Sequence, residues 1–233
     1  ALLEEADFVD WAKYKYGIDE DAIRSEVETE LGEDAEDEDI DAEVEERVNN
    51  AIRENFKNPG TPTDAVGGKV LMINNYRSSN ENDPFTGTAQ KYTSSTTITL
   101  EKDSYGKISV WVNTGDIVAA NNVAYGANIR LANTVSSVTQ DEYSVSNIVT
   151  DGQWVQYTFY VRANDFLSST VQVVLGLGYG AGASTNTDHY VSGSAYFDGV
   201  YYEQLSEGDE GYEEIDWTDA DKPTVQRSSS SDK

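Results

Sequence analysis

The stretch GQWVQYTFYVRAN, residues 152–164, decides the fold expected for this chain. Apolar and polar side chains alternate strictly within it, which is the pattern of a β-strand with one buried face. Val155, Tyr157, Phe159 and Val161 share one face and suit a hydrophobic core. The opposite face carries aromatic, amide and guanidinium groups, which suit contact with a polar ligand.

Further segments in the middle of the chain repeat this alternation and are separated by Gly-rich turns. The segments expected to be strands are residues 69–75, 96–101, 107–113, 127–131, 144–150, 170–177 and 193–203. Short strands at this spacing predict an all-β fold, an antiparallel jelly-roll β-sandwich over residues 66–205. The residues expected to be buried between its sheets are Ile108, Val110, Ile129, Leu131, Tyr157, Phe159, Val173 and Leu175.

The flanks of this middle differ from it in charge and in period. Residues 1–57 are expected to be an acidic helical segment or linker, because apolar residues recur at helical spacing in three places. Residues 33–41, EDAEDEDID, lack the Gly that an EF-hand loop needs at its sixth position, so we interpret them as a solvated linker. The Pro- and Gly-containing residues 58–62 mark the boundary. Residues 206–233 are expected to be an acidic, Ser-rich disordered tail.

Composition excludes several partners and several kinds of site. The 43 acidic and 16 basic residues give a formal charge of −27, of which residues 1–56 carry −16. Such a chain repels nucleic-acid phosphates and anionic membranes, since both bind through Lys and Arg clusters. The absence of Cys excludes disulfides and thiolate metal sites. No apolar run approaches the ~18 residues that a membrane span requires.

Four sequence stretches carry a resemblance to a known family. They are GTAQKYTSSTTITL leading into KISVWVNTG, then GANIRLA, then DGQWVQYTFYV and finally GSAYFDGVYYE, in that order over residues 66–205. This part of the chain resembles the jelly-roll carbohydrate-binding modules of secreted bacterial glycan-degrading systems. It is most similar to modules of starch-adherence proteins on the surface of gut clostridia.

The resemblance implies a function, a location and a metal. The function is non-catalytic binding of polysaccharide, with starch or another α-glucan favoured, within a larger multidomain protein that is secreted or held at the cell surface. The metal is a structural calcium, bound through an acid of the last strand, where Asp198 stands. The alternative interpretation is that Asp198 only hydrogen-bonds the backbone at a bulge beside Gly199.

Sugar recognition suggests which residues bind the ligand, because flat rings suit the C–H faces of a sugar and planar polar groups suit its hydroxyls. The candidate ligand-binding residues are Trp111, Tyr125, Asn128, Gln156, Tyr160 and Tyr179. One location is an outward sheet face, where alternation groups Trp111, Tyr160, Gln156 and Asn128 with Arg130 and Gln172. The other is a loop edge, where Tyr125 and Tyr179 stand among glycines. An outward Trp is also often covered by other parts of a chain.

Catalysis finds little support in the sequence. His189 is the single histidine, and no nucleophile elbow, HExxH, Walker or dinucleotide motif is present. A glycosidase needs only two carboxylates, but the middle of the chain has few acids. We therefore predict a protein that is not an enzyme. The alternative to glycan binding is a protein-interaction or adhesin module with no glycan ligand.

Overall fold

The computed structural model describes two compact units, which are considered separately. The described residues are 5–32, 35–56, 59–62, 70–75, 90–119, 126–133, 139–163, 166, 169–178, 191–209, 212 and 225–229. Ala1–Asn58 forms a helical unit and Pro59–Lys233 a β unit. No described helix has both the length and the apolar character needed to cross a membrane.

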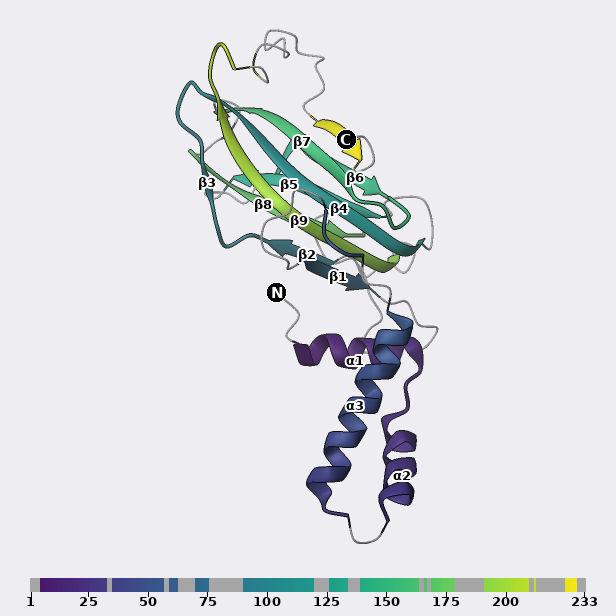
Figure 1. Ribbon diagram of the computed structural model, residues 1–233. Coiled ribbons are helices and arrows are strands. Elements are labelled where there is room, and N and C mark those ends of the chain that lie inside the picture. Colours follow the sequence, from purple (N-terminus) through teal and green to yellow (C-terminus); the bar gives the residue numbers. More distant parts are fainter. Residues whose placement is uncertain are drawn as a thin grey trace. The chain divides into compact units, whose positions relative to one another are not determined.

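The helical unit contains α1 (Glu5–Tyr16), α2 (Glu20–Leu31) and α3 (Asp37–Asn55) (Figure 1). Asp19 begins α2 by accepting a hydrogen bond from the Ala22 amide through Oδ1, at 3.1 Å. The helical prediction is confirmed, but the linker interpretation of residues 33–41 is wrong from Asp37 onward. Acids at a helix N-terminus are favoured by the helix dipole, so an acidic run can begin a helix.

The helices of this unit pack through a narrow apolar stripe. Both α1 and α2 contact α3, and Val44, Val48 and Ile52 of α3 are buried at successive turns. Arg47 ties α3 to α2, since its guanidinium lies 2.6 Å from Glu30 and 2.8 Å from Glu43. Apolar contacts and ion pairs together therefore hold α2 against α3.

The β unit consists of two antiparallel sheets (Figure 1). Sheet I has the order β1-β9-β4-β7-β10, and sheet II has the order β2-β8-β5-β6, with β3 also paired to β8. The strands are β1 (Leu71–Asn75), β2 (Gln90–Thr93), β3 (Ile98–Thr99), β4 (Tyr105–Ala119), β5 (Ala127–Asn133), β6 (Thr139–Ile148), β7 (Val155–Arg162), β8 (Thr170–Leu177), β9 (Val191–Leu205) and β10 (Val225–Ser229).

The chain alternates between the two sheets in the manner of a jelly roll. It passes from β1 in sheet I to β2 in sheet II, returns to β4, crosses to β5 and β6, and then alternates through β7, β8 and β9. Most neighbouring strands are consequently distant in sequence, with β5 and β6 an exception, as in a double Greek key. The predicted fold class, an antiparallel jelly-roll sandwich with helices at the N-terminus, is confirmed.

The core between the sheets contains the residues that alternation predicted. Val155, Tyr157, Phe159 and Val161 of β7 are all buried in one cluster. The same cluster contains Ile108, Val110, Ile129, Leu131, Val173 and Leu175. Each large aliphatic or aromatic side chain buried in this way contributes about 1.5–3 kcal/mol.

Two strands were not expected from the sequence. β2 lies between two of the expected strands, residues 69–75 and 96–101, and β10 lies in the predicted disordered tail. The tail prediction is therefore wrong at Val225–Ser229, which pair with β7 from Phe159 to Val155. A polar edge strand needs no apolar face of its own, because main-chain hydrogen bonds to its neighbour hold it.

Candidate functional site

The residues predicted to share one outward face lie on two different faces of the sandwich. Trp111, Gln156 and Tyr160 belong to sheet I, whereas Asn128 belongs to β5 of sheet II. Arg130 and Gln172, which alternation grouped with them, also belong to sheet II. The single-face prediction is therefore wrong. Alternation tells which side of its own strand a residue occupies, and it does not tell which sheet the strand joins.

On the outer face of sheet II, Arg130 is anchored by a buried amide. Its Nη2 donates to Oδ1 of Asn128 at 2.8 Å, and Nδ2 of Asn128 donates to the Gly178 carbonyl at 3.0 Å. Asn128 is only 2% exposed. The guanidinium therefore rests on a side chain that is itself fixed to the backbone. A preformed arrangement of this kind loses little entropy when a ligand binds.

A glycine makes room for this arrangement. Gly176 of β8 lies opposite Asn128 across the ladder. A Cβ atom at Gly176 would lie 2.5 Å from Oδ1 of Asn128 and 3.0 Å from its Cγ. The Asn128 amide can therefore lie over β8 only because residue 176 has no side chain. Sequence reasoning passed over Gly176, since a glycine within a strand shows a close approach only when its neighbour is known.

Burial lowers the pKa of the Arg130 guanidinium from its ordinary value, although the group keeps its charge at neutral pH. Arg130 is half-buried, with Val174 of β8 on one side of it and Ser144 of β6 on the other. Gln172 lies farther along β8, where its Nε2 donates to the Ser94 carbonyl at 2.8 Å. This face thus presents planar donors held in fixed positions, which suit oxygen-rich ligands.

On the outer face of sheet I, the predicted residues are less available. Trp111 is 1% exposed and packs against the backbone of Gly199, so its ring offers no surface to a ligand. Gln156, its neighbour on β7, is half-buried, and so is Tyr160. Of these three predicted residues, only Gln156 and Tyr160 can contact a molecule lying on this sheet.

The two predicted loop tyrosines, Tyr125 and Tyr179, lie outside the described residues, as does His189. Their nearest described neighbours in sequence, Gly126 and Gly178, are joined by a 2.9 Å hydrogen bond from the Gly178 amide to the Gly126 carbonyl. Asn128 is bonded to the same Gly178.

The predicted metal ligand, Asp198, lies on β9 beside Trp111. Its Oδ1 accepts a hydrogen bond from the Gly199 amide at 2.7 Å, which is the bond that the bulge interpretation expects. Its Oδ2 is buried without a hydrogen-bond partner. Among the described residues, no group of three His, Asp or Glu side chains is placed to hold a metal ion.

Comparison with known proteins identifies no family from sequence. No protein-family model and no curated protein matches the chain. Solved structures with a similar arrangement include a CBM4 structure (16% identity, TM-score 0.38, covering 65% of this chain and 82% of that one). A family 16 carbohydrate-binding module matches at 13% identity and a TM-score of 0.35, over 62% of this chain and 83% of that one. TmCBM61 bound to β-1,4-galactotriose matches at 13% identity and a TM-score of 0.30, over 64% and 97%. At these scores the likeness carries no argument about function.

Proposed function

We propose that the β unit is a non-catalytic glycan-binding module whose main binding face is the outer surface of sheet II around Arg130. The observation that carries this proposal is the anchored, half-buried guanidinium on Asn128, above Gly176. A charged planar donor in the middle of a sheet face adds nothing to the core packing. It does suit the hydroxyl oxygens of a sugar, which accept hydrogen bonds from several directions.

On the sequence alone, Tyr125 and Tyr179 remain the proposed stacking residues for the sugar rings. Tyr125 and Tyr179 each adjoin one of the bonded glycines beside Asn128. Rings from two loops can be angled against each other, which suits a curved chain. This agrees with the α-glucan preference that the resemblance in sequence implies, and we propose starch or another α-glucan as the ligand, held at a bacterial cell surface or in an enzyme complex.

Affinity electrophoresis through gels containing soluble starch, β-glucan, xylan or β-1,4-galactan tests this proposal. We expect starch to retard the β unit, and Arg130→Gln to weaken binding about ten- to a hundredfold, because a hydrogen bond to a charged group contributes about 1.5–3 kcal/mol. Arg162→Gln, an exposed arginine on sheet I, is the matched control and should bind normally.

Two results would contradict the proposal. If Arg130→Gln and Arg162→Gln weakened starch binding equally, sheet II would not be the main binding face. Free migration in all four gels would contradict glycan binding altogether and favour a protein partner.

We also propose that Asp198 ligates a structural calcium ion. The buried, unpartnered Oδ2 supports this, because a buried carboxylate oxygen without a partner is costly and calcium takes 6–8 oxygen ligands. Chelation by EDTA should then lower the melting temperature of the wild type. Asp198→Asn, which keeps an oxygen but loses the charge, should remove that response. An unchanged wild-type melting curve would leave Asp198 with only its bulge hydrogen bond.

A further inference from the structure

A β-bulge in β9 changes which tyrosine faces outward. On β4, Trp111 pairs with Asp198 of β9, and Ser109 pairs with Tyr201 of β9. The two β4 residues are two positions apart, whereas their β9 partners are three positions apart. One extra residue is therefore inserted in β9. Counted from the buried Phe197 without that insertion, Tyr201 would point into the core. With it, Tyr201 joins Ser109 on the outer face of sheet I, and Tyr202 packs against the core.

The bulge depends on Gly199. Its φ of +56° is in the left-handed region, and an added Cβ would lie 2.9 Å from Cδ1 of Trp111. Both the backbone conformation and the space therefore require glycine at this position. Bulges are often found where a strand redirects a side chain for function. The inward-outward exchange at Tyr201 and Tyr202 is thus built into the sequence through Asp198-Gly199.

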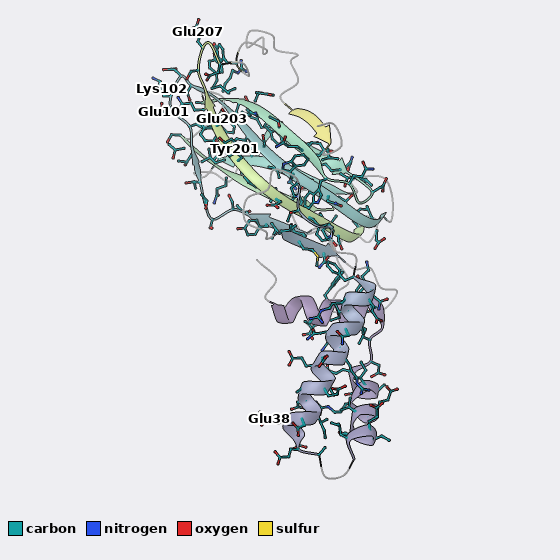
Figure 2. The ribbon with its side chains drawn as sticks, in the orientation of Figure 1. Glu38, Glu101, Lys102, Tyr201, Glu203 and Glu207 are labelled. Atoms are coloured by element: carbon teal, nitrogen blue, oxygen red, sulfur yellow. The ribbon has the colours of Figure 1, made fainter. Side chains whose placement is uncertain are left out.

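Tyr201 is 58% exposed, more than any other large hydrophobic or aromatic side chain in the described part of the chain. Two charged residues lie next to it on the same face: Lys107 of β4 and Glu203 of β9 pair across the ladder, with 3.9 Å between Nζ and Oε2. On the other side of Lys107 lies the half-buried Tyr160. Figure 2 shows Tyr201 and Glu203 on β9, on the same strand as this bulge.

We propose that Tyr201, Lys107 and Glu203 form a second saccharide-binding site on sheet I. This inference rests on the proposed glycan-binding function. An exposed ring suits the C–H face of a sugar, and the adjacent ammonium and carboxylate suit its hydroxyls as donor and acceptor. The charged Lys107 and Glu203 lie beside the ring on the same face, and this polar setting suits a sugar better than an apolar protein surface.

The two proposed sites lie on opposite sides of the β unit. The Arg130 face and the Tyr201 face are the outer surfaces of opposite sheets, and packed sheets lie about 10 Å apart with a filled core between them. A glycan chain lying flat on one face does not reach the other. A single β unit therefore binds two polysaccharide chains at once and bridges them, rather than holding one chain more tightly.

Calorimetry with maltoheptaose and turbidity with soluble amylose test this inference on the full chain. We expect two maltoheptaose molecules per wild-type protein and one per protein for both Tyr201→Ala and Arg130→Gln. Wild type should make amylose solutions turbid, because it bridges amylose chains. At the same fraction of protein bound to amylose, neither Tyr201→Ala nor Arg130→Gln should produce turbidity. Tyr201→Phe keeps the ring and should retain both sites. Because Tyr201 is exposed, Tyr201→Ala and Tyr201→Phe should fold, and melting curves of all three variants will verify this.

The outcomes separate this inference from the proposed function. One site in the wild type that is lost in Arg130→Gln and unchanged in Tyr201→Ala overturns the second site while the proposed function stands. One site that is lost only in Tyr201→Ala supports sheet I and overturns sheet II as the main face. The absence of any binding to maltoheptaose or amylose overturns the bridging inference, and the four-gel assay then decides whether another glycan is bound.

Discussion

Replacing Gly176 by Ala tests the link between the sheet II face and the packing beneath it. The new Cβ would lie 2.5 Å from Oδ1 of Asn128, closer than real Cβ contacts allow. Because the backbone of β8 is fixed by pairing with β5 and β2, the Asn128 amide has to move. Its movement breaks the hydrogen bonds to Gly178 and from Arg130.

The cost follows from those two bonds. A neutral hydrogen bond contributes about 1 kcal/mol, and one to a charged group about 1.5–3 kcal/mol. Against this, replacing Gly by Ala stabilises by roughly 0.4–1 kcal/mol where the backbone conformation permits it. The net expectation is a loss of about 1.5–3.5 kcal/mol. For a unit of this size that corresponds to a melting temperature lower by roughly 3–14 °C.

The assay is thermal unfolding of the full chain, followed by a signal from the β unit, with Gly115→Ala as the matched control. A Cβ at Gly115 of β4 meets nothing within 4 Å, so Gly115→Ala should leave the melting temperature unchanged or raise it slightly. Asn128→Ala removes the clashing amide. Adding Gly176→Ala to Asn128→Ala should therefore cost little beyond Asn128→Ala alone, which is a coupling between residues in contact.

The reasoning fails if Gly176→Ala is as stable as Gly115→Ala. It also fails if the effects of Gly176→Ala and Asn128→Ala simply add, since the destabilisation then has no connection with the amide. Starch binding provides a second measurement. Gly176→Ala should weaken it together with stability, because the movement of Asn128 removes the support of Arg130.

Two further predictions concern the parts of the chain outside that face. Ending the chain after Thr224 removes β10 and leaves the edge of β7 unpaired, which should lower the melting temperature of the β unit by roughly 2–8 °C, for about 1–2 kcal/mol of lost pairing. Ending it after Ser229 should have no effect, and equal melting of the two truncated chains would show that β10 does not stabilise β7. In the helical unit, the hydrogen bond from Arg47 lowers the pKa of Glu30 below its usual 4.5. That contact therefore stabilises the unit above pH 4.5 and is lost as pH falls through the lowered pKa. Arg47→Gln should flatten the fall in helicity below pH 4.5, and an unchanged pH profile would contradict this.

Local pattern was sufficient for most of the elements and for the core, although it missed β2 and β10. Period-2 alternation in residues 152–164 predicts both the strand β7 and its buried side, because successive side chains of any strand point to opposite faces. The helical spacing of apolar residues predicts α1 to α3 in the same way. The start of α3 was misplaced, since an acidic run suits a linker and a helix N-terminus equally.

Pairing between distant segments decided the rest. Alternation places both Asn128 and Trp111 on the side of their strand that faces away from the core, yet β5 joins sheet II and β4 joins sheet I. Tyr201 faces outward only because β9 gains a residue against β4 at Gly199. The anchored position of Arg130 depends on Gly176, 46 positions away in the chain. The sequence alone determined which side of most strands faces the core, because that choice depends on residues two positions apart. Only the tertiary structure decided which polar side chains meet, because register and sheet membership depend on hydrogen bonds between segments far apart in the chain.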